Sequence, residues 1–342
     1  MEKEKVMTTK KRFIFILLFI APLACIFLSL FIGRYPISMS VVVKVLWTKL
    51  IGGQTVMPDQ YEAIIWEIRL PRAVLGALVG GSLAISGAAF QGLFRNPLVS
   101  SGILGVSSGA GFGAALAILL FNSTTHIYLF SFCFAGIAVL ASYLIGRVYN
   151  TTPTIMLVLG GVIVSSVFAA LLSFTKYVAD PYNQLPAITF WLMGSLASAS
   201  YRDVLVGGVP MLIGIGGILA VRWRLNILSM GDKEAQTLGL NTNLNKGIII
   251  FCTTIATAGA VCVSGIIGWV GLVIPHIGRM IVGNDNKVLV PASLFLGASF
   301  LIIVDNIGRI ITGSEIPLGI LTALVGGPFF VYLLKKTKGG GW

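Results

Sequence analysis

The stretch "GIIIFCTTIATAGAVCVSGIIGWVGLVIPHIGRMIVG" (residues 247–283) decides how the rest of the chain is arranged. Its 37 residues are nearly all apolar, and a single helix of that length would be about 55 Å long at 1.5 Å per residue. The hydrocarbon core of a bilayer is only about 30 Å thick. We therefore predict two short membrane spans, 247–264 and 266–283, joined by a tight turn at Ser264 and Gly265.

Apolar runs of similar length recur along the whole chain. Of its 342 residues, 56% are hydrophobic and 11% are charged, with a mean hydropathy of +0.94. A soluble domain has about 25% charged residues. The composition predicts an all-α polytopic membrane protein that forms one domain over residues 1–342. Ten spans are expected, at 13–33, 72–91, 102–121, 127–146, 153–174, 201–221, 247–264, 266–283, 288–310 and 316–334.

The basic residues orient these spans. The net charge is +12, which in a soluble protein would suggest a nucleic-acid partner, but the charges here lie between apolar spans. Ten spans place both termini on one side, and that side collects sixteen of the 24 Lys and Arg residues. Cytoplasmic loops carry the excess of basic residues. We therefore predict that both termini are cytoplasmic, in a cell membrane.

The opening stretch contains Pro275, His276 and Arg279, which together resemble a reactive cluster. The other histidine, His126, lies on a different span without a nearby carboxylate, so a metal site is not expected. The chain also lacks a Gly-Lys dipeptide and therefore a P-loop. We predict no catalytic residue, metal or cofactor in this chain, and we interpret the stretch as a bent span with a structural histidine.

Three arginines lie where spans meet the outer surface. Asp305 and Arg309 are four residues apart on one predicted helix and can pair. Arg69 and Arg72, in "RLPR", bracket the start of span 72–91. Each arginine is either an ordinary interfacial group or a positive docking point for a partner with carboxylates.

The long cytoplasmic loop, 222–246, contains "SMGDKEAQTLGL", which predicts a short helix. Gly231 and Asp232 begin it and Gly239 ends it, while Ala235 and Leu238 could share one face. Such a helix would suit the groove of a soluble partner, and the alternative is a solvated loop.

Glycines spaced four apart predict close helix packing. The pairs are Gly76–Gly80, Gly105–Gly109 and Gly109–Gly113. Small residues at this spacing allow two helix backbones to approach each other.

Several longer motifs resemble one family. They are "RLPR" (69–72), "GGSLAISGAAFQGLFRNPLVSSGILGVSSGAG" (80–111), "GDKEAQTLGL" (231–240), "GIIGWVGLVIPHIGRMIVGNDNKVLVPASLFLGASFLIIVDNIGR" (265–309) and "EIPLGILTALVGGPFFVYLL" (315–334). With these motifs the chain resembles the permease subunits of the ABC importers for iron–siderophore complexes, haem and cobalamin. The resemblance covers nearly the whole chain.

The resemblance implies a type II ABC importer permease with ten spans that is not itself an enzyme. The implied partners are a second permease subunit, identical or not, two ABC ATPase subunits that bind ATP and Mg, and an extracytoplasmic binding protein. The residues implied for coupling to the ATPase are Gly231, Asp232, Glu234, Ala235, Leu238 and Gly239. Those implied for docking of the binding protein are Arg69, Arg72 and Arg309. Those implied for the cytoplasmic gate are Asn96, Pro97, Leu98, Thr152 and Thr154.

The cargo implied first is an iron–siderophore complex, with haem or cobalamin as alternatives. An ion-coupled secondary transporter is a rival of a different class, disfavoured because no span carries a carboxylate near its middle. A membrane-embedded enzyme is disfavoured because no nucleophile–base pair or metal cluster can be assembled.

Overall fold

The computed structural model describes residues 2–33, 35–51, 58–147, 152–311 and 315–336. Every regular element in these ranges is a helix. Each predicted span has a matching helix, in chain order α1 (Glu2–Ser29), α4 (Leu70–Phe94), α5 (Val106–Leu120), α6 (Thr124–Gly146), α7 (Thr154–Val178), α9 (Tyr201–Leu228), α11 (Thr242–Ser264), α12 (Val270–Val282), α13 (Asn286–Ile311) and α14 (Leu318–Lys336).

Six of the described helices are long and apolar enough to cross a membrane, namely α4 with the helical turns before it, α6, α7, α9, α11 and α13. The apolar parts of α1, α5, α12 and α14 are shorter, at 10–17 residues. The polytopic α-helical fold is therefore confirmed, while the number of ten crossings stays a prediction.

The predicted break after Ser264 is confirmed, but the second helix begins four residues later than the predicted residue 266. Helix α11 ends at Ser264, Gly265 adopts a left-handed φ of +69°, and α12 begins at Val270. The Ser264 carbonyl accepts a hydrogen bond from the backbone N–H of Ser195 at 2.8 Å. A neighbouring segment therefore satisfies this freed carbonyl, which unpaired in an apolar interior would cost several kcal/mol.

The segments between the spans contain more helix than we predicted. The outer segment 34–71 includes α2 (Met39–Ile51), α3 (Asp59–Glu62) and a π-helix, η1 (Ala63–Arg69), that runs directly into α4. The outer segment 175–200 includes α8 (Gln184–Met193). In the predicted loop 222–246, the flanking helices α9 and α11 extend inward, so only residues 229–241 connect them, and α10 (Asp232–Thr237) lies within that connection.

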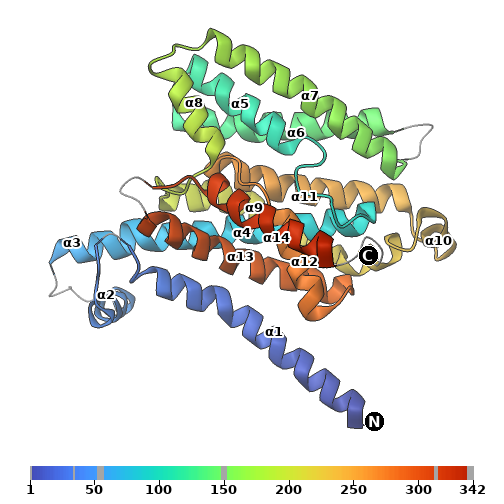
Figure 1. The fold of residues 1–342 in the computed structure, drawn as a ribbon, viewed down its shortest axis with the longest axis horizontal. Helices are drawn as coiled ribbons and strands as arrows, with labels where there is room; N and C mark the ends of the chain where they lie inside the picture. Colours follow the sequence, from blue (N-terminus) through green and yellow to red (C-terminus); the bar gives the residue numbers. More distant parts are fainter. Residues whose placement is uncertain (1, 34, 52–57, 148–151, 312–314, 337–342) are drawn as a thin grey trace.

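The helices form three layers in Figure 1. Helices α5 to α8 make one outer group, α4, α9 and α11 to α14 make the central group, and α1 with α2 lies on the opposite side. The start of α1, the end of α14 and α10 all point toward one end of the bundle, and α2 and α3 lie at the other. This places the two ends of the described chain on the same side, and their cytoplasmic location stays a prediction.

Helix α4 is the centre of the bundle. Its membrane-crossing window is 83% buried, against 28% for α7 at the periphery. At Gly80 the backbone of α13 comes so close that a Cβ atom would lie 2.2 Å from the carbonyl oxygen of Gly297. Close packing is thus confirmed for Gly80.

The other predicted packing glycines differ among themselves. Cβ atoms on Gly109 and Gly113 of α5 would each lie 2.4 Å from a backbone oxygen of α6, so these two positions also allow close approach. Gly105 has another role, because its φ is +86° and it is the residue that precedes α5. A left-handed backbone favours glycine.

Candidate functional site

Helix α10 stands at the end of the bundle toward which the start of α1 and the end of α14 also point. It begins after Gly231, whose φ is +136°, and the chain turns away at Gly239, whose φ is +80°. Asp232 and Glu234 lie in the first turn, where carboxylates favour the positive end of the helix dipole. The predicted helix and both glycine boundaries are therefore confirmed.

The two apolar residues of this helix segment do not share a face. Ala235 is fully buried, whereas Leu238 is 61% exposed. The prediction that they lie together is wrong because α10 lasts only six residues and Leu238 already belongs to its end. Ala235 anchors the helix on the bundle, and Leu238 presents an apolar side chain outward.

A buried lysine connects α10 to two spans, and the sequence reasoning missed it. The ammonium of Lys246 on α11 lies 2.7 Å from a carboxylate oxygen of Asp232 and donates to the carbonyl of Thr152 at 2.9 Å. The side chain of Lys246 is only 2% exposed. A buried cation needs such partners, because burial of an unpaired charge is costly.

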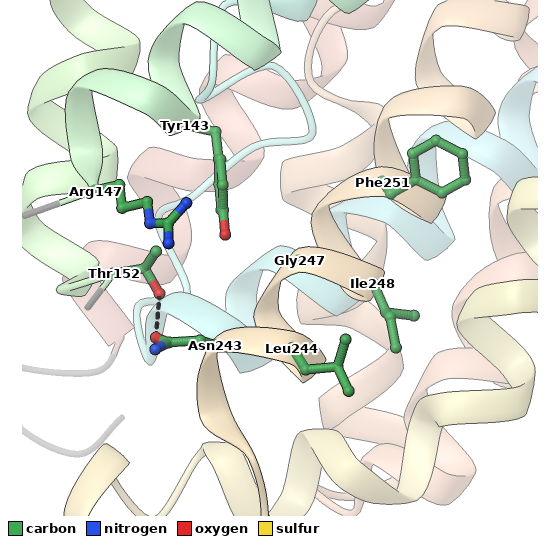
Figure 2. Close-up of a pocket in the computed structure, with 8 residues that line it drawn as sticks. All are labelled: Tyr143, Arg147, Thr152, Asn243, Leu244, Gly247, Ile248 and Phe251. Carbon is green, nitrogen blue, oxygen red and sulfur yellow. Dashed lines mark hydrogen bonds between the residues drawn. The ribbon is translucent and has the colours of Figure 1, made fainter. Parts of the chain in front are cut away.

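Thr152 lies just before α7 and faces the start of α11. Its hydroxyl donates to the side-chain oxygen of Asn243 at 3.1 Å, as Figure 2 shows. Thr154 is the first residue of α7 and is partly exposed. The structure thus brings Thr152 into the network around Lys246, and the gating role of both threonines stays a prediction.

The "NPL" turn follows α4. Arg95 ends that helix with a left-handed φ of +53°, and the Asn96 side chain then accepts from the backbone N–H of Leu98 at 2.9 Å. Gln91 donates to the carbonyl of Val99 at 3.1 Å and ties the turn back to the helix. Leu98 is half-exposed, so the turn is held by polar contacts rather than by burial of its own apolar residue.

A cavity of about 580 Å³ lies between this turn and the stretch 269–283 that contains α12. Asn96 and Pro97 line it from one side, and His276 and Arg279 of α12 from the other. His276 is buried, and the Arg279 guanidinium donates to the side-chain oxygen of Gln91. Arg279 therefore ties α12 to Gln91 of α4, the residue that also bonds to the turn through Val99.

At the opposite end of the bundle, the three predicted docking arginines are buried. Arg69, Arg72 and Arg309 are 4%, 6% and 6% exposed. One guanidinium nitrogen of Arg72 lies 2.8 Å from Asp305 and 2.8 Å from Glu315. These side chains therefore do not project outward, because Asp305 of α13 and Glu315 before α14 supply counter-charges to Arg72, and Asp305 supplies one to Arg309. Their role in docking stays a prediction.

The rest of this outer cluster is also internal. Arg309 pairs with Asp305 at 3.3 Å, which confirms the predicted i,i+4 pair, and it donates to the Ser29 hydroxyl at 2.7 Å. Arg69 donates to two backbone carbonyls, and one of them is that of Leu30, at 2.7 Å. Two carboxylates thus sit among three guanidinium groups, and Glu315, which the sequence reasoning did not single out, is the one at the exposed edge, with 30% of its side chain accessible.

Comparison with known proteins places this geometry in context. The profile of the FecCD transport family matches residues 18–336. The chain is 41% identical over 318 residues to the molybdate import system permease MolB of Haemophilus influenzae, covering 92% of this chain and 93% of that protein. It is 38% identical over 325 residues to an iron chelatin transport system permease of Helicobacter pylori, covering 89% and 98%. A solved inward-facing structure of a metal-chelate-type ABC transporter superposes with a TM-score of 0.85 at 37% identity, covering 94% of this chain and 99% of that one.

Proposed function

The chain belongs to the FecCD transport family of ABC importer permeases, and we propose that its cargo is an iron–siderophore complex. The proposal for the cargo is supported by the iron chelatin permease among the relatives. The molybdate permease is slightly more similar, at 41% against 38% identity, so an oxyanion joins haem and cobalamin as an alternative cargo. Permeases of this kind work with a second permease subunit and with ATPase subunits.

The link from α10 to α7 is the observation that carries a coupling mechanism. Asp232 of α10, Lys246 of α11 and the carbonyl of Thr152 before α7 are joined by two short contacts of 2.7 and 2.9 Å. A partner that moves α10 would therefore move the starts of two spans. Coupling requires only that this linked element has two positions, and that the ATPase and the loaded binding protein each shift the equilibrium between them.

The proposed cycle assigns the remaining parts. Ten spans cross the membrane with both termini and α10 in the cytoplasm. A cargo-loaded binding protein docks at the end that carries α2 and α3, ATP binding closes the ATPase pair against α10, and the "NPL" turn with the start of α7 opens inward. The buried arginines Arg69, Arg72 and Arg309 would contribute positive potential at the docking surface rather than direct ion pairs.

Leu238→Asp is expected to weaken binding of the ATPase by tenfold or more. The side chain is 61% exposed, so the fold should tolerate the change, while a carboxylate in an apolar groove of the partner would be desolvated without a counter-charge. Co-purification of the ATPase with tagged permease measures the effect. Leu244→Asp, at a leucine that is 59% exposed on α11, is the matched control. An equal loss of ATPase binding in both variants would show that α10 has no special role in that binding.

Lys246→Met is expected to lower cargo uptake at least tenfold while ATP hydrolysis by the complex continues. The change removes a buried charge-assisted contact to Asp232 and the contact to Thr152, and such contacts contribute about 1.5–3 kcal/mol. Uptake and ATPase rates in proteoliposomes give the two readouts. Lys287→Met, at an exposed lysine near the start of α13, is the control. Loss of uptake and hydrolysis in equal proportion would point to misfolding instead of uncoupling.

The cargo is tested by deleting the gene and restoring it on a plasmid. We expect uptake of radiolabelled ferric siderophore to fall on deletion and to recover with the wild-type gene. Loss of molybdate, haem or cobalamin uptake instead would identify one of the alternatives. Uptake that persists without any ATPase subunit would favour the ion-coupled secondary transporter.

A further inference from the structure

A long groove runs along the side of the bundle between α6 and α11. Its main part is a cavity of about 540 Å³. The lining is almost entirely apolar and includes Phe132, Val139, Leu140, Ile250, Phe251 and Ile255. Leu140 and Phe251, one from each helix, are 58% and 63% exposed, so the groove is open to the surroundings of the bundle.

The groove ends in a polar mouth on the α10 side. A second cavity of about 410 Å³ shares Tyr143, Gly247 and Phe251 with the first. Figure 2 shows Tyr143 and Arg147 extending from α6 above the first turns of α11, with Thr152 and Asn243 below them. The two cavities together form an apolar trough whose α10 end carries Arg147 and several polar groups. Beyond Phe132, a further cavity of about 420 Å³ extends to Arg202 near the start of α9.

The length of the trough matches one leaflet of a bilayer. Phe132 and Tyr143, the first and last residues of α6 that line the 540 Å³ cavity, are eleven residues apart, which is about 16 Å at 1.5 Å per residue. Half of the hydrocarbon core is about 15 Å thick. A lipid whose acyl chain lies along the groove with its methyl end beside Phe132 would therefore have its headgroup at the level of Tyr143 and Arg147.

We propose that this groove binds an anionic phospholipid of the leaflet on the α10 side. One acyl chain lies against Val139, Leu140 and Phe251, and the phosphate lies at Arg147. A guanidinium binds phosphate through two parallel hydrogen bonds, and basic pockets between spans on the cytoplasmic side bind anionic headgroups. A polar metal chelate does not suit the apolar trough, so this site is distinct from the path of the cargo.

The site goes beyond the transport function proposed above and joins two parts of the fold. Helix α6 belongs to the outer group of helices, and α11 belongs to the central group and carries Lys246 at its start. The bound lipid would fill the space between these groups.

Native mass spectrometry of the full chain, purified with its accompanying subunits and stripped of lipid, tests the proposal. The probes are dioleoyl phosphatidylglycerol and dioleoyl phosphatidylcholine. We expect one phosphatidylglycerol per permease to bind about fivefold more tightly than phosphatidylcholine, the effect of one cation near a headgroup. Arg147→Gln should remove that preference and leave phosphatidylcholine binding unchanged, whereas Arg222→Gln on α9 should preserve the preference.

A second variant tests the trough itself. A Cβ atom on Gly136 of α6 meets no atom within 4 Å and Gly136 lines the groove, so Gly136→Leu should occupy the groove and weaken binding of both lipids at least tenfold. Gly216→Leu on α9 has equal space and lies outside the groove, so it is the control. Gly247→Leu blocks the trough from α11 if Gly136→Leu does not fold.

Two results would overturn the proposal. Equal affinity of the wild type for the two lipids would show that the site does not select an anionic headgroup. Unchanged binding in the two groove-filling variants would show that the lipid does not bind in the groove. Because binding is measured without ATP or cargo, neither result depends on the transport function.

Discussion

Asp305→Asn is expected to destabilise the folded permease by about 3–5 kcal/mol, the usual cost of removing one partner from a buried ion pair. Asp305 is the shared counter-charge of Arg72 and Arg309, and all three side chains are almost fully buried. Asparagine keeps the shape but removes the charge, so the guanidinium groups of Arg72 and Arg309 lie close together with Glu315 as the remaining carboxylate of the cluster. The thermal midpoint in detergent and the recovery of monodisperse protein measure the effect.

Glu315→Gln is the matched control. Its side chain is 30% exposed, so water can replace much of its contact with Arg72, and we expect a loss of about 1 kcal/mol. A double-mutant cycle of Asp305→Asn with Arg72→Met isolates the pair itself, and a coupling energy of more than about 1 kcal/mol is expected for residues in direct contact. Additive effects of the two changes would show that the ion pair contributes nothing specific.

Gly80→Ala is the second large effect, and we expect little or no folded protein. The new methyl group would lie 2.2 Å from the Gly297 carbonyl oxygen and 2.6 Å from the Leu301 Cβ atom, neither of which can rotate away. Overpacking of this kind costs about 1–3 kcal/mol and more where backbone must move. The same measurements of thermal midpoint and recovery apply.

Gly216→Ala controls for the loss of a helical glycine. A Cβ atom there meets nothing within 4 Å, and alanine is favoured over glycine inside a helix by about 1 kcal/mol. This variant should be as stable as the wild type or slightly more stable. If both variants behaved alike, the close approach of α4 and α13 would not be a requirement of the fold.

The spans could be predicted from the sequence because membrane thickness limits helix length. That limit alone located the break at Ser264 and Gly265. The extra helices could not be predicted in the same way, since α2 and α8 are only 13 and 10 residues long and do not have to cross a bilayer. Such short helices depend on packing: α2 packs against α3 and η1, and α8 packs against α5 and α14, which are remote from it in sequence.

In the candidate site too, features marked by neighbouring residues could be predicted, and features that depend on distant residues could not. Helix α10 was predictable because glycine and acidic residues mark its boundaries locally. The i,i+4 pair of Asp305 with Arg309 was predictable for the same reason. The burial of Arg72 was not, because its partners follow more than 230 positions later. Lys246 was missed because only the tertiary fold brings Asp232 and Thr152 to it.

The separation between Arg72 and Asp305 also has a consequence for biosynthesis. The two residues are 233 positions apart, and at about 5–20 residues per second a ribosome needs roughly 10 to 50 s to add them. During that interval the outer end of α4 carries Arg72 while its acidic partner Asp305 on α13 has not yet been made. The newly inserted helix must therefore keep this end among water, headgroups or the insertion machinery until α13 emerges. In a nascent chain arrested before residue 305, Arg72 would lack the carboxylate with which it is paired and buried in the complete fold.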